Sequence, residues 1–210
     1  TEDAEPPADT IEWPDASRVA PLSELAMWTS SSGFVPQPGV SATIEPHAGP
    51  VLSLATVIAS GLPPEAEVDL LWVTSRGNRV SPSGWSLSET PLTQAMVGQD
   101  GSLSATIEIP DDLGGWHAVK LVQGGKVLAE VPYRLEPSLI GVTPKRVRAG
   151  EPFTVHLKGV GWTELDNAFA VTYDNAYTGY ACGFNSNGDV QLTLVATGGP
   201  GTHLVDLYPM

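Results

Sequence analysis

The feature that most constrains this 210-residue chain is an internal repeat, because two stretches carry similar landmarks in the same order. Each has a Gly-containing bend, an apolar strand ending in a second Gly turn, a turn dipeptide before another strand, and a Gly-rich turn before a histidine. Sixteen residues separate Gly101 from His117, and fifteen separate Gly188 from His203. The agreement predicts two copies of one domain type, the first with an insertion around residues 76–94. The matched segments are Ala48–Pro50 with Ala149–Pro152, Ser60–Leu62 with Lys158–Val160, Asp100–Leu103 with Asn187–Val190, and Gly114–Val119 with Gly199–Val205.

Short apolar runs separated by turn residues predict an all-β fold. Residues 103–109 alternate apolar and polar side chains, as a strand with one solvated face does. The 22 Gly and 19 Pro residues interrupt helices, and no twelve-residue stretch shows a helical apolar stripe. Asp100-Gly101 and Asn187-Gly188 each lead into a strand, which is typical of a β-hairpin because Asn and Gly tolerate positive φ.

Two tandem β-sandwiches with an irregular N-terminal leader account for this pattern. Residues 1–40 are predicted to be a Pro-rich irregular leader, 41–137 the first sandwich and 138–210 the second. The linker Leu135–Ser138 is short and contains Pro, which predicts limited bending and an extended rod. The second unit is one strand short of a seven-stranded sandwich, so we expect it to be a fragment or to be completed by a partner. The single cysteine, Cys182, excludes an internal disulfide.

The second unit resembles the opening of an IPT/TIG-type immunoglobulin-like domain. The residues that carry the resemblance are Ile140-Gly141-Val142-Thr143-Pro144, then Ala149-Gly150, then residues 155–162 ending in Gly159-Val160-Gly161-Trp162, where an aromatic is usual. The Gly-Gly-Trp-His motif ending at His117 is similar to modules of bacterial cell-surface proteins. The resemblance implies an immunoglobulin-like fold and an exported, extracellular or cell-surface bacterial protein. Such domains serve as spacers, adhesion units and accessory modules of extracellular enzymes.

The charge of the chain argues against several functions. Its net charge of −14 repels phosphate backbones and anionic lipids, and no Lys/Arg cluster is expected to offset it. Nucleic-acid binding is therefore not predicted. No apolar run approaches the roughly 20 residues of a membrane span. Neither a G-x-S-x-G nucleophile elbow nor a phosphate-binding glycine loop is present, so we predict no enzyme activity and no cofactor.

Six residues are candidate binding residues. His117 and His203 follow Gly-rich turns at matching positions, so they mark either one ligand site per repeat or an imidazole that caps a turn. No metal site is predicted, because such sites need three or four converging ligands. Trp85 lies in the polar insertion, and Tyr173, Tyr177 and Tyr180 cluster in the second unit. Exposed aromatic rows suit protein or carbohydrate recognition, whereas buried ones are core residues.

The sequence therefore favours a non-catalytic extracellular spacer or interaction module within a larger exported or surface assembly. Its expected partners are other protein chains or further domains of the same polypeptide. The alternative is an accessory, carbohydrate-binding region of a larger extracellular hydrolase.

Overall fold

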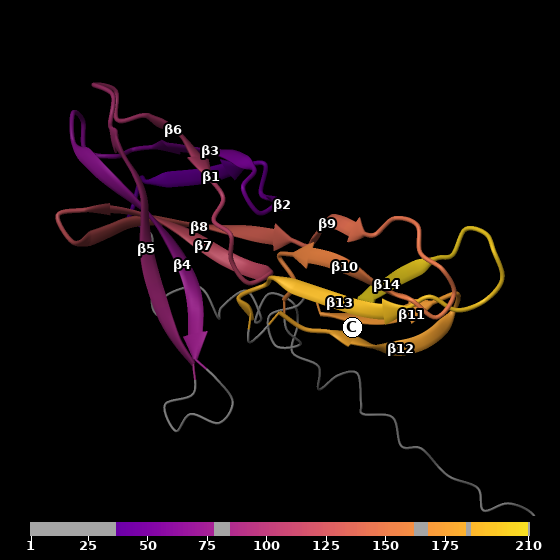
Figure 1. The fold of residues 1–210 in the computed structure, drawn as a ribbon. Helices are drawn as coiled ribbons and strands as arrows, with labels where there is room; N and C mark the ends of the chain where they lie inside the picture. Colours follow the sequence, from indigo (N-terminus) through magenta and orange to yellow (C-terminus); the bar gives the residue numbers. More distant parts are fainter. Residues whose placement is uncertain (1–36, 78–84, 162–167, 184–185, 210) are drawn as a thin grey trace, which may run out of the picture.

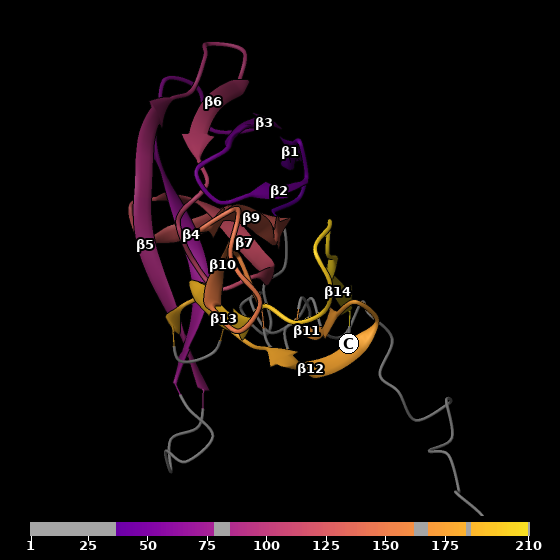
Figure 2. The ribbon, with the colours of Figure 1, turned by 45° about the vertical axis from the view of Figure 1, so that its right-hand side comes forward.

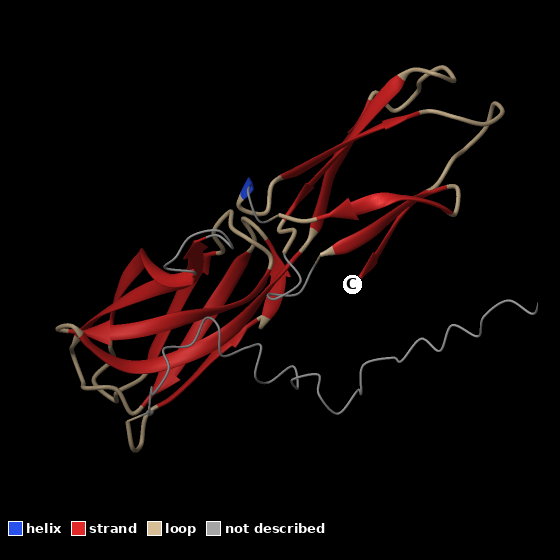
Figure 3. Ribbon diagram, turned by 90° about the horizontal axis from the view of Figure 1, so that it is seen from below, coloured by secondary structure: helices blue, strands red, loops and turns tan. Residues whose placement is uncertain are grey.

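The computed structural model describes residues 37–77, 85–161, 168–183 and 186–209, and within these ranges it contains fourteen strands and no α-helix. The all-β prediction is confirmed. The strands build two immunoglobulin-like sandwiches that follow one another along the chain and lie end to end (Figure 1, Figure 3). Of the predicted leader, residues 1–36 lie outside the described residues.

The first sandwich packs a three-stranded sheet, in the order β1-β3-β6, against a five-stranded sheet, in the order β2-β8-β7-β4-β5. Neighbouring strands are antiparallel except for the parallel pair of β2 and β8. The long β4–β5 hairpin accounts for the predicted insertion (Figure 2). The strands are β1 (Ser41–Glu45), β2 (Ala48–Pro50), β3 (Leu54–Ser60), β4 (Glu67–Gly77), β5 (Trp85–Met96), β6 (Leu103–Glu108), β7 (Gly115–Gln123) and β8 (Lys126–Glu136).

The second sandwich packs the sheet β13-β10-β9 against the sheet β12-β11-β14, with all pairs antiparallel. Alternate residues of β10 and β11 point inward and form the core, which centres on Phe153, Val155, Leu157 and Val171. The strands are β9 (Ser138–Thr143), β10 (Pro152–Lys158), β11 (Phe169–Tyr173), β12 (Ala176–Ala181), β13 (Val190–Val195) and β14 (Val205–Pro209).

Equivalent backbone bonds show that the two sandwiches are copies of one pattern. Gly61 and Gly159 both have positive φ, 73° and 66°, after β3 and β10. In both sandwiches the residue after this glycine donates its N–H to the carbonyl oxygen of a turn glycine. Leu62 donates to Gly101 O before β6, and Val160 donates to Gly188 O before β13, both at 3.1 Å. However, β6 pairs with β3 and β13 with β10. The hairpin prediction was therefore wrong, since each turn carries the chain across to the opposite sheet.

The first landmark of the repeat, the match of Gly49 with Gly150, was wrong by three residues. Gly150 donates its N–H to Ala196 at 2.8 Å, and the residue that does the same in the first sandwich is Leu52, to Ile109, also at 2.8 Å. Leu52 has a φ of 61°, so no glycine marks this bend in the first copy. Ala48–Pro50 instead forms β2.

Close backbone contacts join the two sandwiches. Only Pro137 separates β8 from β9. Gly114 of the first sandwich donates its N–H to Val160 O of the second at 3.3 Å, and a Cβ at Gly114 would lie 1.9 Å from Gly159 O. A Cβ at Gly188 would lie 2.4 Å from Asp112 O. The three glycines therefore allow an approach that no larger residue permits.

Polar contacts surround this junction. Lys158 forms an ion pair with Asp111 across it, which raises the pKa of the Lys158 ammonium group. Lys158 also lies 3.8 Å from Asp189 on its own side. Asn187 donates its amide to Asp111 O at 3.4 Å. Contacts from the end of β10 and from two loops of the second sandwich thus hold one loop of the first.

Candidate functional site

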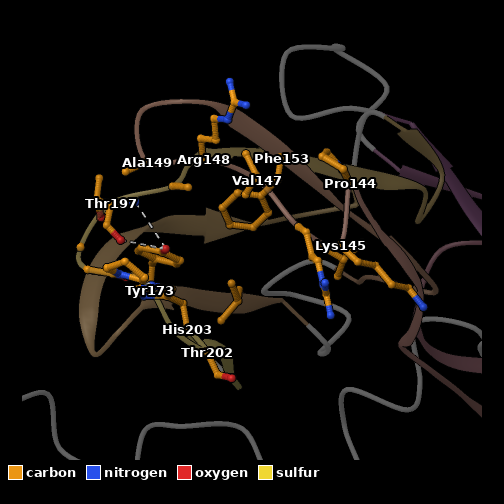
Figure 4. A pocket seen from close by; sticks show the side chains of 18 residues that line it. Pro144, Lys145, Val147, Arg148, Ala149, Phe153, Tyr173, Thr197, Thr202 and His203 are labelled. Atoms are coloured by element: carbon orange, nitrogen blue, oxygen red, sulfur yellow. Dashed lines mark hydrogen bonds between the residues drawn. The ribbon is translucent and has the colours of Figure 1, made fainter.

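A pocket of about 900 Å³ lies at one end of the second sandwich, between the loop of residues 144–149 and the loop of residues 196–203 (Figure 4). Its floor is apolar because the inward-facing residues of β10, β11 and β14 reach it. Phe153, Tyr173 and Val205 come from these strands, and Val142 and Val147 complete the lining. The pocket is therefore an uncovered end of the second core.

Tyr173 and His203 form the polar wall of this pocket, and Asp174 is hydrogen-bonded to His203. The His203 ring stacks on Tyr173, with centroids 5.6 Å apart and planes at 17°. His203 Nδ1 lies 2.5 Å from Asp174 Oδ2, and Nε2 lies 2.9 Å from Gly199 O. Since both neighbours are acceptors, both contacts are hydrogen bonds only when each ring nitrogen carries a proton. This arrangement therefore favours the imidazolium form of His203.

The pKa values agree with this pairing. The hydrogen bond with Asp174, followed by that with Gly199 O, raises the pKa of His203 above its ordinary 6.5. The same bond, together with the Leu204 N–H, lowers the pKa of Asp174 below its ordinary 3.8. The Asp174 carboxylate and the His203 imidazolium therefore form a charged pair at weakly acidic pH.

His117 occupies the equivalent place in the first sandwich, but it is buried, with 1% of its surface exposed. Its Nε2 lies 2.6 Å from the carbonyl oxygen of Leu113, four residues earlier in the chain. Gly199, whose carbonyl oxygen contacts Nε2 of His203, likewise lies four residues before that histidine. Nδ1 of His117 lies 3.1 Å from Val73 O, and its ring stacks on Trp72 with centroids 4.5 Å apart. Both histidines thus bond to the turn before their strand.

A buried carboxylate accompanies His117. Trp72 donates its indole N–H to Asp112 at 2.9 Å, and the Leu113 N–H lies 2.8 Å from the same carboxylate. Burial alone would raise the pKa of Asp112, but the nearby His117 and these hydrogen bonds outweigh it and lower the pKa. This cluster is enclosed in the first core and offers no surface to a ligand. Nowhere in the described part of the chain do three His, Cys, Asp or Glu side chains converge on a metal position.

A basic rim borders the pocket of the second sandwich. Lys145, Arg146 and Arg148 are three of the ten Lys and Arg residues, and all are exposed. Lys145 and Arg148 project outward from the apolar floor (Figure 4). The statement that the chain has no Lys/Arg cluster was wrong here, because the overall charge of −14 masked a local concentration of positive charge.

The predicted tyrosine cluster is divided between two faces of one sheet. Tyr173 points into the core, where its hydroxyl donates to Thr197 O at 3.2 Å. Tyr177 and Tyr180 pair with Thr172 and Ala170 on the outer face, because a β-bulge between them reverses the alternation. Tyr208 pairs with Ala170 from the other side. Tyr177, Tyr180 and Tyr208 are 68%, 67% and 51% exposed, so they form one outward aromatic face.

The remaining candidate, Trp85, begins β5, and its side chain lies outside what the structure describes. Cys182 is half-buried and has no disulfide partner. Sequence reasoning missed the basic rim and Tyr208. The run Lys145-Arg146-Val147-Arg148 was visible in the sequence, whereas the position of Tyr208 depends on strand register.

No protein-family model and no curated protein matches the chain. Solved structures that match include the Escherichia coli adhesin FdeC (16% identity, TM-score 0.30, covering 79% of this chain and 58% of the adhesin). The human OSCAR ligand-binding domain also matches (15%, 0.28, 77% and 84%). A third is the Pseudomonas fluorescens alkylpurine DNA glycosylase AlkC bound to DNA with an abasic site analogue (15%, 0.29, 48% and 31%). This chain thus spans less than two thirds of the adhesin and glycosylase chains, and likenesses this low do not decide its function.

Proposed function

We propose that this chain is a non-catalytic interaction module, a rigid two-domain spacer in an exported or surface assembly of bacterial proteins. The second sandwich is proposed to be of the IPT/TIG type, and the domains to span residues 41–137 and 138–210. The observation that carries the proposal is the glycine-lined junction, where Gly114 and Gly159 bring the two backbones into direct contact. No helix capable of crossing a bilayer occurs among the described residues.

The chemistry of the pocket supports a binding role rather than catalysis. Both nitrogens of His203 face acceptors, Asp174 and Gly199 O, and in the imidazolium form that this arrangement favours the ring has no lone pair with which to accept a proton. Tyr173 uses its hydroxyl on the backbone of Thr197. The polar groups of Tyr173 and His203 are therefore already used in hydrogen bonds that hold two loops together.

Small-angle X-ray scattering tests the spacer role. We expect the profile of the whole chain to fit one fixed arrangement of the two sandwiches. Gly114→Val places a side chain against Gly159 O and is expected to loosen the junction and broaden the range of arrangements. Gly141→Val is the matched control, because nothing lies within 4 Å of a Cβ there. Free swivelling of the unaltered chain would contradict the rigid-spacer role.

Carbohydrate recognition is a second candidate, favoured by the outward aromatic face. Tyr180 and Tyr208 flank the small side chain of Ala170 across three strands, so their Cα atoms are about 10 Å apart. Flat rings with polar tips suit stacking against the apolar side of a sugar ring. A glycan array with the chain and its Tyr180→Ser variant tests this, and equal signals from both would count against it.

A further inference from the structure

The junction between the two sandwiches contains the one Asn-Gly dipeptide of the sequence, Asn187-Gly188. An asparagine amide next to glycine is open to attack by the following backbone nitrogen, because glycine has no side chain to block the approach. Asn187 is exposed, whereas Gly188 is buried and packs against the first sandwich. A dipeptide with intrinsic chemical reactivity therefore lies where the two sandwiches touch.

The docked junction engages both of the groups that this reaction uses. The Gly188 N–H, which carries the attacking nitrogen, donates to Gly183 O at 2.9 Å. The Asn187 side-chain amide, which carries the leaving group, donates across the junction to Asp111 O at 3.4 Å. A Cβ at Gly188 would lie 2.4 Å from Asp112 O, so the first sandwich also restrains the backbone of this turn. The dipeptide is thus protected while the two sandwiches are docked.

We propose that Asn187 is a site of spontaneous deamidation, which the docked junction protects and which loosens the junction once it has reacted. The Gly188 nitrogen loses its proton and attacks Cγ of Asn187, the bond from Cγ to Nδ2 breaks, and ammonia leaves with that proton. Water then opens the succinimide at either carbonyl, which leaves aspartate or isoaspartate at position 187. The inference adds a modification site to the proposed spacer role and rests on the docked junction of that role.

The product adds a negative charge to a junction that is already rich in carboxylates. Lys158 forms an ion pair with Asp111 and lies 3.8 Å from Asp189. A carboxylate at position 187 has no hydrogen to donate, so the bond to Asp111 O becomes a contact between two acceptors. The like charges around Lys158 repel one another as well. Both effects favour separation of the two loops.

Aspartate fits this turn, so the change is expected to act on the junction rather than on the fold of the second sandwich. Asp174 has a φ of 49°, close to the 54° of Asn187, and aspartate tolerates this region of backbone conformation. The first sandwich has Asp100 at the equivalent position, where Ser102 donates its N–H and hydroxyl to the carboxylate at 3.0 and 2.7 Å. In the second sandwich Asp189 replaces Ser102, so the product meets a carboxylate instead of a hydroxyl donor.

Peptide mapping by mass spectrometry tests the protection. The whole chain is incubated in mildly alkaline buffer, which speeds loss of the Gly188 proton, beside a synthetic peptide of residues 183–193 as the unprotected reference. We expect Asn187 to deamidate about tenfold more slowly in the chain than in the peptide, because reaction requires local opening. Gly114→Val, which opens the junction, should speed the reaction several-fold, and Gly141→Val should leave it unchanged. Asp111→Ala removes the ion pair with Lys158, keeps every glycine and should act in the same direction as Gly114→Val.

A matched pair of variants tests the consequence for the junction. Asn187→Asp reproduces one product and is expected to broaden the range of arrangements seen by small-angle scattering, as Gly114→Val does. Asn175→Asp adds the same charge in the turn between β11 and β12, at the other end of the second sandwich, where Asp174 contacts Leu204. Asn175 also has a positive φ, 66°, so the two substitutions place aspartate in similar backbone conformations. The scattering profile of Asn175→Asp should match that of the unaltered chain.

The proposal is overturned if Asn187 reacts as fast in the chain as in the peptide, or if opening the junction leaves its rate unchanged. It is also overturned if Asn187→Asp leaves the scattering profile unchanged. Scattering from the freshly prepared, unaltered chain tests the rigid-spacer role by itself. A failure of the modification site is therefore distinguishable from a failure of the spacer role.

Discussion

The two sandwiches share a pattern, yet the first is closed and the second is open. Val119 is fully buried beneath β8, while its equivalent Val205 lies at the edge of a pocket. His117 is enclosed with Asp112, while His203 and Asp174 line a rim that solvent reaches. A repeated residue is thus part of the core where a neighbouring strand covers it, and part of the surface where none of the described strands does.

The largest expected effect comes from the two histidines. His117→Gln should destabilise the first sandwich by about 3–5 kcal/mol, because it removes the charge partner of the buried Asp112. His203→Gln should cost the second sandwich far less, since solvent screens a half-exposed pair. Urea denaturation followed by hydrogen exchange resolves the two sandwiches. Equal losses of stability from the two substitutions would contradict the difference between the buried and the half-exposed histidine.

Two equivalent valines give the next effect. Val119→Ala should cost about 2 kcal/mol, because a fully buried valine loses its contacts and leaves a cavity. Val205→Ala should cost less than half of that, since the side chain is only partly buried. Denaturation midpoints measure both. Equal losses of stability at the two valines would contradict the difference in their burial.

Local patterns predicted the fold well because each landmark has a local cause. The turn glycines Gly61 and Gly159 need positive φ, so they are visible in the sequence. The bend at Leu52 has the same conformation without a glycine, so the first landmark was placed three residues out of register. The division of the tyrosines depends on the bulge in β12, which no spacing in the sequence reveals.

The binding residues were harder to predict, because a site is formed by what a sheet lacks as much as by its residues. His203 was predicted as a binding residue from its place after a Gly-rich turn, whereas its exposure beside the pocket depends on how the strands around it pack. Lys145, Arg146 and Arg148 are candidate binding residues only because they border the pocket. The site assignments from sequence therefore stay predictions, and the experiments above decide them.

The stability of the second sandwich should depend on pH through His203 and Asp174. The raised pKa of His203 stabilises the second sandwich below about pH 6.5 and is lost as pH rises through the folded-state pKa. The lowered pKa of Asp174 stabilises it above about pH 3.8 and is lost as pH falls through the folded-state pKa. The pair should thus stabilise the second sandwich most between these two pH values. Denaturation of the Asp174→Asn variant should lack this maximum, and a maximum that persists would contradict the pairing.

The smallest expected effects separate the tyrosines that the sequence grouped. Tyr173→Phe should cost about 1 kcal/mol, because the hydroxyl donates to Thr197 O and accepts the Thr197 N–H inside the second sandwich. Tyr177→Ser and Tyr180→Ser should change stability by less than about 0.5 kcal/mol, since both rings lie on the outer face. Denaturation of the three single variants measures this. A large loss of stability at Tyr177 or Tyr180 would mean that the outer face is packed rather than exposed.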